Sequence, residues 1–250
     1  MTAKTFPIII FADGASSGNP GPGGWGAIIA TPEGHVQELG GGDPQTTNNR
    51  MELLGTIASL ARVIDRPEPI AVYTDSVYVI RGITQWIWGW RKKGWKTAEG
   101  KDVVNQDLWK KLSGILAERP RDARPVDWRW VRGHSGVPGN ERVDEIAVAF
   151  SRRGGTSLFN GPLLEYGLAI HDIPENTDLP DQRPKAVKTA AHSYLSLLGS
   201  IPMRHKTWAS CERRVKGQSG ARFKKAMSAD DESSILRAWG FALKDLRDAP

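Results

Sequence analysis

The hydrophobic period of this 250-residue chain changes from strand-like to helix-like several times, and this alternation restricts the fold most. Three stretches near the N-terminus, 7–12, 25–31 and 35–39, have the apolar and β-branched character of strands. The glycine-rich residues between the first two predict a turn, and residues 40–44 predict a loop. From Thr46 the apolar residues recur at helical spacing. A meander of three strands followed by a helix is therefore predicted.

The same alternation continues to about residue 150. We predict further strands at 69–74 and 126–131, and helices at 77–82, 106–118 and 141–150. Strands that alternate with helices in this order favour a layered α/β fold. The predicted fold class is α/β, with a five-stranded mixed sheet flanked by helices.

Composition is that of an ordinary soluble globular protein, with 39% hydrophobic and 25% charged residues. The net charge of +6 favours an anionic partner without identifying it. Because Cys211 is the only cysteine, no intrachain disulfide is possible, and a reducing compartment is expected. The apolar run Ile8–Ala12 is too short for a signal peptide or a membrane span. We expect a cytoplasmic protein that does not enter membranes.

Composition shifts after the predicted helix at 141–150. Residues 154–188 contain four prolines and no sustained period, so they are predicted to be a linker, although their apolar first half is suited to packing on the main domain. Residues 189–250 predict a small α/β domain, with strands at 191–198 and 221–226 and a last helix at 228–246. The predicted organisation is a main domain at 1–153, the linker, and this second domain.

Four carboxylates occupy unusual positions in the main domain. Asp13 and Asp75 each follow a buried apolar strand, Glu52 interrupts an apolar helical stripe, and Asp144 begins a helix after a glycine-rich loop. A single acidic residue is most often a solvated surface charge, but strand-end acids of one sheet can lie side by side. Clustered carboxylates repel one another unless a cation is present. Oxygen ligands favour Mg²⁺ or Mn²⁺ over Zn²⁺, and phosphoryl transfer is the chemistry best served.

Five segments then resemble a known family, in order, over residues 8–152. They are DGASSGNPGPGGWGAI, TTNNRMELL, YTDSVYVIRGI, the pair WGWRKKGWK and VVNQDLW, and WVRGHSGVPGNERVDEIA. Together they resemble ribonuclease H of type 1 from bacteria. The glycine-rich segment lacks the Lys-Ser/Thr ending of a nucleotide-binding P-loop, so that alternative is not supported. The resemblance implies a ribonuclease H-like fold.

What the resemblance implies about activity is specific. It implies a metal-dependent endonuclease that hydrolyses the RNA strand of an RNA/DNA hybrid and leaves 3′-hydroxyl and 5′-phosphate ends. By this comparison two Mg²⁺ ions, with Mn²⁺ as an alternative, are held by Asp13, Glu52, Asp75 and Asp144. His134 matches a family histidine that assists proton transfer or product release, a role suited to an imidazole.

The resemblance also implies substrate contacts. Asn19, Asn48 and Asn49 match positions that contact the minor groove of the hybrid, and Thr47 matches a position near the DNA phosphate. Without the family, asparagines in such loops are more often turn formers. Val77 departs from relatives that carry glutamine after Asp-Ser, which removes one polar contact with RNA.

The segment Trp86–Lys96, which follows the predicted strand before Asp75, is rich in tryptophan and in basic residues. The tryptophans suit the packing of a projecting helix while the cations meet phosphates, as in the basic protrusion of bacterial members of the family. A helix with an apolar seam and a solvated basic face is the simpler interpretation. The substrate-binding residues expected here are Trp86, Trp90, Lys92, Lys93 and Lys96.

The C-terminal stretch at about 192–240 resembles the small hybrid-binding domain of some type 1 ribonucleases H. By that comparison Trp208 and Phe223 stack on the DNA strand, while Lys224 and Lys225 hold phosphates. A core role for either aromatic is the alternative. The usual basic loop is replaced by apolar residues at 197–201, so the alternatives of weak hybrid binding, double-stranded RNA binding and protein binding stay open.

Two other functions remain compatible with these residues. One is a non-catalytic protein that binds hybrids or double-stranded RNA, against which the unbroken ligand set argues. The other is a different nuclease of the ribonuclease H-like superfamily, such as a DNA-cutting integrase. The expected partner is an RNA/DNA hybrid, and the expected working form is a monomer.

Overall fold

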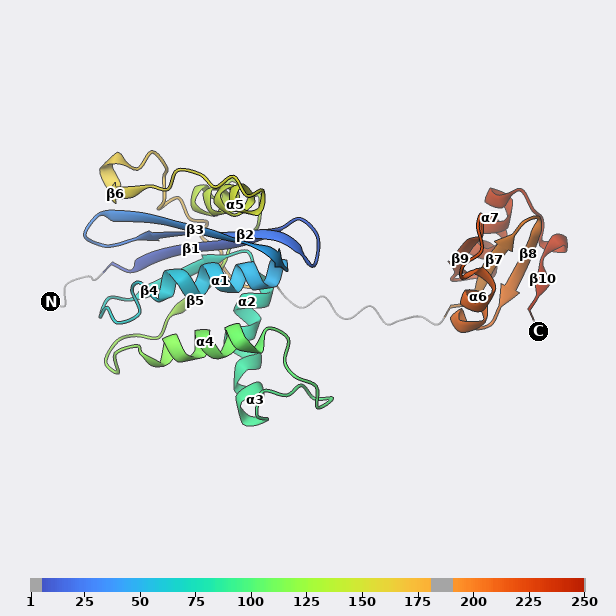
Figure 1. Ribbon diagram of the computed structural model, residues 1–250, viewed down its shortest axis with the longest axis horizontal. Coiled ribbons are helices and arrows are strands. Elements are labelled where there is room, and N and C mark those ends of the chain that lie inside the picture. Colours follow the sequence, from blue (N-terminus) through green and yellow to red (C-terminus); the bar gives the residue numbers. More distant parts are fainter. Residues whose placement is uncertain (1–5, 181–190, 250) are drawn as a thin grey trace. The chain divides into compact units, whose positions relative to one another are not determined.

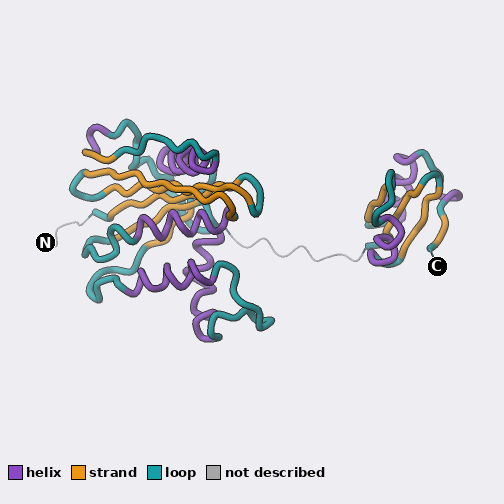
Figure 2. Tube along the Cα trace, viewed as in Figure 1, coloured by secondary structure: helices purple, strands orange, loops and turns teal. Residues whose placement is uncertain are grey.

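The chain forms two compact units, Met1–Pro180 and Asp181–Pro250. The computed structural model describes residues 6–180 and 191–249 (Figures 1 and 2). Within these residues no helix combines the length and the apolar character needed to cross a membrane. Part of the expected linker, 181–188, lies outside the described residues.

The first three strands form an antiparallel meander, as predicted, but they are longer than expected. They are β1 (Ile8–Ser16), β2 (Gly21–Ala30) and β3 (His35–Thr46). Asp13 is therefore not at the end of its strand; it pairs with Gly26 of β2 inside the sheet. The predicted loop at 40–44 is wrong for the same reason, because Gly40–Gly42 continue the pairing with β2.

The α/β prediction is confirmed, but the sheet of the first unit has six strands rather than five. The strands are ordered β5-β4-β1-β2-β3-β6. The strands β4 (Ile70–Thr74) and β5 (Asp127–Trp130) are parallel to β1, which makes the sheet mixed. The additional strand, β6 (Asn160–Pro162), pairs antiparallel with β3. It comes from the expected linker, where no periodic pattern marks a strand.

Helices cover both faces of this sheet (Figure 1). The helices α1 (Asn48–Leu60) and α4 (Gln106–Ala117) pack with Ile8 and Ile10 in one apolar cluster. On the opposite face, α5 (Pro138–Ser151) packs against Ile9 and Phe11 in a second cluster. Because successive side chains of a strand alternate between faces, β1 supplies both clusters. The sheet thus carries a core on each side.

After β4 the chain forms a helical protrusion that belongs to the first unit. It consists of α2 (Val77–Arg81), a π-helical turn η1 (Gly82–Trp86) and α3 (Ile87–Lys92), which follow one another without a break (Figure 2). The turn brings Gly82 against Trp109 of α4, where an added Cβ would lie 2.0 Å from the indole. The protrusion is thereby attached to α4.

The expected linker at 154–188 does not begin at residue 154. Residues up to Pro180 belong to the first unit. Besides β6, this segment forms the 3₁₀ turn η2 (Leu163–Glu165) and buries Tyr166 and Ile170 in the cluster under α5. Tyr166 and Ile170 thus extend the apolar cluster on the face that α5 covers, whereas Leu164 is exposed.

The second unit is a small α/β layer of its own. Its four-stranded sheet is ordered β10-β8-β7-β9, and its core contains Leu195, Ala226, Ile235 and Leu236. The predicted last helix is too long, because Gly240 at φ 88 ends it after Trp239. The elements are β7 (Ser193–Leu198), β8 (Ile201–His205), α6 (Trp208–Val215), β9 (Arg222–Ala226), α7 (Ala229–Trp239), η3 (Leu243–Asp245) and β10 (Arg247–Asp248).

Candidate active site

The four carboxylates come from four different elements of the first unit. Asp13 lies in β1, Glu52 in the first turns of α1, Asp75 just after β4, and Asp144 in α5. Asp13 is only 7% exposed, while the other three are partly buried. Asp75, Asp144 and Glu52 all act electrostatically on Asp13. The sequence predicts that these residues lie together, and in the fold the other three are near enough to Asp13 to raise its pKa by charge repulsion.

Close backbone packing brings Glu52 toward Asp13. A Cβ on Gly14, the residue after Asp13, would lie 2.3 Å from the backbone nitrogen of Glu52. Only glycine therefore lets α1 approach β1 this closely. The Glu52 carboxylate is then fixed by two donors: Asn48 Nδ2 donates at 2.9 Å and Ser76 Oγ at 2.5 Å. Ser76 had no role in the sequence prediction, although its position before a helix is typical of a cap.

Asp75 is held by three neighbours that the sequence did not single out. The indole Nε1 of Trp130 donates to the Asp75 carbonyl at 3.1 Å, and the buried Asn140 donates to its carboxylate. Gly133 passes so close that a Cβ there would lie 2.4 Å from Asp75 Oδ2. Trp130 and Asn140 flank the loop that carries His134, which is the only sequence signal for their role.

Burial and repulsion between the carboxylates raise the pKa values of Asp13, Glu52 and Asp75. Burial, and then the charge of Asp75, raises the pKa of Asp13 to about 8, although the Gly14 N–H opposes the shift at 2.7 Å from Oδ1. Burial also raises the pKa of Glu52, with hydrogen bonds from Ser76 and Asn48 acting against it. For Asp75, burial raises the pKa, while hydrogen bonding from Asn140 and the nearby His134 lower it.

Such a cluster fits a hard divalent cation, since a bound cation would remove the repulsion and carboxylate oxygens are its preferred ligands. Within residues 6–180 and 191–249, however, no group of three or more His, Cys, Asp or Glu side chains is arranged so that it could hold a metal ion by itself. A cation held by fewer carboxylates would take its remaining ligands from water or from a bound substrate.

His134 lies beside this cluster on an exposed loop. Its backbone adopts φ 50, in the left-handed region. The loop is tied down on both sides, because Ser135 Oγ donates to the Arg132 carbonyl at 2.5 Å and the Gly136 N–H donates to Glu141 at 2.8 Å. The exposed His134 imidazole is thus near enough to Asp75 to act on it electrostatically, and its loop is restrained by two hydrogen bonds.

The expected groove-contacting residues flank the same edge. Asn19 and Asn49 are exposed, whereas the Asn48 amide is committed to Glu52. Thr47 is the N-cap residue that precedes α1; it is partly buried, and its side chain makes no capping hydrogen bond. Of the four residues, Asn48 is the one whose side chain is bonded to a carboxylate of the group.

In and just after the protrusion, two tryptophans pack against other rings, while the lysines are exposed. Trp86 and Trp90 belong to a ring cluster, with centroids 5.7 Å apart and Trp109 5.4 Å beyond Trp90. Lys92 and Lys93 are exposed, whereas Lys96 forms an ion pair with Asp102 at 2.7 Å. Both interpretations from the sequence thus describe part of the structure: the aromatic rings pack, and the cations point outward.

In the second unit, three aromatic rings lie together on the surface. The Trp208 ring is 5.4 Å from that of Phe223 and 5.9 Å from that of Tyr194, measured between centroids. Trp208 is 40% exposed and Phe223 51%, so neither is a core residue. Lys224 and Lys225 follow Phe223 along β9 and are exposed. Because side chains alternate along a strand, Lys225 lies on the face of β9 that carries Phe223, whereas Lys224 points to the other face.

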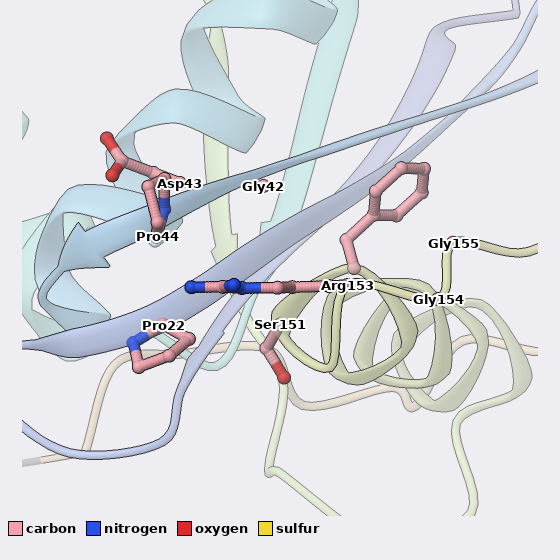
Figure 3. A pocket seen from close by; sticks show the side chains of 9 residues that line it. Pro22, Gly42, Asp43, Pro44, Ser151, Arg153, Gly154 and Gly155 are labelled. Carbon is pink, nitrogen blue, oxygen red and sulfur yellow. The ribbon is translucent and has the colours of Figure 1, made fainter.

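The carboxylates do not line the hollow formed by the C-terminal end of α5. That hollow, of about 410 Å³, is lined by the β2–β3 backbone and the residues after α5 (Figure 3). Arg153 extends from the end of α5 toward the side lined by Pro22 and Pro44.

The strand order β5-β4-β1-β2-β3-β6 and the helices on both faces define the class of ribonuclease H-like folds. The carboxylates come from β1, α1, α5 and the residue after β4. Residues 6–152 match the RNase H family. The chain belongs to the RNase H family. Ribonuclease H of Cyanothece sp. is 52% identical over 144 residues, which cover 57% of this chain and 87% of that protein. Ribonuclease H of Maricaulis maris is 52% identical over 140 residues, 56% of this chain and 90% of that protein.

Solved structures support the same fold. A type 1 RNase H with the type 2 active-site motif matches with a TM-score of 0.54 and 29% identity, over 66% of this chain and 82% of that chain. A foamy viral protease-reverse transcriptase in complex with RNA/DNA hybrid matches with a TM-score of 0.50 and 18% identity, over 61% of this chain and 22% of that chain. The second likeness concerns the fold alone.

Proposed function

We propose that this protein hydrolyses the RNA strand of RNA/DNA hybrids and leaves 3′-hydroxyl and 5′-phosphate ends. The observation that carries the proposal is the group of four carboxylates from β1, α1, β4 and α5, in a chain of the RNase H family. Divalent ions, which we propose are two Mg²⁺ with Mn²⁺ as an alternative, would activate the attacking water and neutralise the leaving oxygen when held there.

The residues of the chain have separate tasks in this proposal. Asp13, Glu52, Asp75 and Asp144 bind the ions, with Ser76 and Asn140 keeping two of the carboxylates oriented. His134, exposed at the open side, exchanges a proton with the departing product or assists its release. Asn19, Thr47, Asn48 and Asn49 contact the minor groove, where the 2′-hydroxyl distinguishes RNA from DNA.

Two further surfaces would bind parts of the hybrid that are distant from the cleaved phosphate. The exposed cations of the protrusion would meet phosphates, and the basic balance of residues 186–250, 12 Lys and Arg against 6 Asp and Glu, supports the same role for the second unit. There, Trp208 and Phe223 would stack on bases while Lys224 and Lys225 hold the backbone. We propose a monomer that works in the cytoplasm, for which the free, buried Cys211 gives support.

The deciding experiment is cleavage of an end-labelled RNA/DNA hybrid by the full chain with Mg²⁺, beside the variant Asp13→Asn. The unmodified chain should cut the RNA strand, and the variant should lose more than about 100-fold in rate, because it loses a direct ligand. Binding of the hybrid without cutting by the unmodified chain would favour a non-catalytic binder. A DNA duplex run in parallel should stay intact; its cleavage would favour a different nuclease of the superfamily.

A further inference from the structure

Residues 156–180, which we call the strap, run from one edge of the main sheet to the other. At the β3 edge the strap adds β6, and the Glu38 N–H donates to the Phe159 carbonyl at 2.8 Å. At the β5 edge, the Trp130 N–H donates to the Thr177 carbonyl at 2.9 Å. Between these ends, Tyr166 and Ile170 are buried in the cluster beneath α5. The family match ends at residue 152, before the strap begins.

The first attachment of the strap is a buried carboxylate. Glu38 is only 4% exposed, and it accepts hydrogen bonds from the Tyr166 hydroxyl at 2.8 Å and the Phe159 N–H at 2.9 Å. Burial alone would raise the pKa of Glu38, but the hydrogen bonds from Arg142, Phe159 and Tyr166 bring it below its ordinary value. The group is thus an ionised acceptor that the strap helps to satisfy.

The same carboxylate holds α5. Arg142 donates to both oxygens of Glu38, from Nε at 2.8 Å and from Nη2 at 3.0 Å, and Nη2 also donates to the Ser157 carbonyl of the strap at 3.2 Å. Arg142 precedes Asp144 by two residues on α5. The strap, Glu38 and Arg142 therefore fix the part of the helix that carries a proposed metal ligand.

The second attachment leads to another proposed ligand. Thr177 is 7% exposed, and its hydroxyl accepts from Arg129 Nη1 at 3.1 Å, next to the backbone bond to Trp130. The Trp130 indole in turn donates to the Asp75 carbonyl at 3.1 Å. The two ends of the strap thus reach Asp144 through Arg142 and Asp75 through Trp130.

We propose that the strap is a positioning device for the carboxylate cluster, with Tyr166 and Thr177 as its positioning residues. It sets the spacing of Asp144 and Asp75 relative to Asp13. The metal-binding unit of this chain therefore extends to Pro180 and includes sequence beyond the family match. The inference rests on the proposed function for its activity readout only, because spacing of the carboxylates also governs metal binding without substrate.

The test uses the full chain with Tyr166→Phe, which removes one hydroxyl donor and keeps the ring that packs on Phe159 at 4.9 Å. Mg²⁺ alone is titrated into the protein and followed by calorimetry. The half-saturating Mg²⁺ concentration should rise about threefold to tenfold, less than for partners that touch a ligand directly. Amide hydrogen exchange should speed up at residues 141–145, and kcat on the hybrid should fall at unchanged KM.

The control is Leu164→Ala, since this strap residue is 100% exposed. It should match the unmodified chain in Mg²⁺ affinity, exchange and kcat. Thr177→Val tests the other end and should also weaken Mg²⁺ binding. If Tyr166→Phe lowers only the melting temperature, with Mg²⁺ affinity and exchange at 141–145 unchanged, the strap closes the fold and positions nothing. If the unmodified chain binds Mg²⁺ but leaves hybrids intact, the proposed function fails while the Mg²⁺ titration still decides the role of the strap.

Discussion

Among the single side chains, Asp13 bears the largest electrostatic cost in the first unit. It is almost fully buried, it faces three other carboxylates, and its pKa is raised to about 8. Proteins accept such costs mainly at functional sites. Glu38 is equally buried but has the opposite character, because Arg142, Tyr166 and a backbone N–H satisfy its charge. The contrast separates a carboxylate whose charge is opposed by its surroundings from one whose charge is satisfied by its partners.

The raised pKa of Asp13 predicts how the stability of the folded protein depends on pH when a chelator removes divalent ions. The folded protein retains a proton that the unfolded chain releases, so its stability falls as pH rises from 3.8 toward about 8. Thermal melts across this range should show the fall, Mg²⁺ should reverse it, and Asp13→Asn should flatten it. An equally steep fall in Asp13→Asn would assign the pH dependence to other groups.

At the scale of helices and strands, the arrangement of the carboxylates depends on how closely α1 packs on β1. In Gly14→Ala the new Cβ would meet the Met51 and Glu52 backbone, which cannot rotate away. We expect a loss of about 1–3 kcal/mol in the free energy of unfolding, with loss of cleavage because Glu52 is displaced. Gly114→Ala in α4 is the control, because open space surrounds that position; it should stabilise by about 0.4–1 kcal/mol. Chemical denaturation measures both, and equal effects would contradict the packing explanation.

The protrusion makes a separate prediction about its lysines. Lys92 and Lys93 are exposed, and we propose that they hold phosphates away from the site of cleavage. Lys92→Ala and Lys93→Ala should therefore raise KM for the hybrid with little change in kcat. Lys96→Ala should have the smaller effect, since that lysine is already paired with Asp102. Steady-state kinetics at several salt concentrations would show the KM difference shrinking as salt rises. A collapse of kcat at saturating hybrid would refute a purely binding role.

The sequence predicted the first five strands and the main helices of the first unit, because each depends on a local pattern. The role of the four carboxylates stays a prediction. It did not predict that β3 continues through Gly40–Gly42. Glycines there signal a loop, but the fold requires them: a Cβ on Gly40 would lie 2.4 Å from the Phe150 ring of α5. Trp130 and Asn140 were missed for a related reason, since their partners come from distant parts of the chain.

Across the whole chain, the boundary between the units follows the strap and not the end of the family match. A chain that ends at Pro180 should melt like the first unit of the full protein and still cut hybrids, with weaker binding. A chain that ends at Gly155 should be far less stable, because it exposes the surface covered by Tyr166 and Ile170, each worth about 1.5–3 kcal/mol, and takes two donors from Glu38. Melting curves and expression yield decide this, and equal stability of the two shortened chains would place the boundary near Gly155.

The ring cluster of the protrusion also has an optical consequence. Trp86, Trp90 and Trp109 have neighbouring centroids 5.7 and 5.4 Å apart, close enough for excitation to pass between indoles. Of the ten tryptophans, only Trp208 and Trp239 belong to the second unit, and Trp208 is on its surface. The difference between the emission of the unmodified chain and that of Trp208→Phe would give the contribution of Trp208, which reports on the surface of the second unit. Intrinsic fluorescence can therefore follow each unit separately while a hybrid is added.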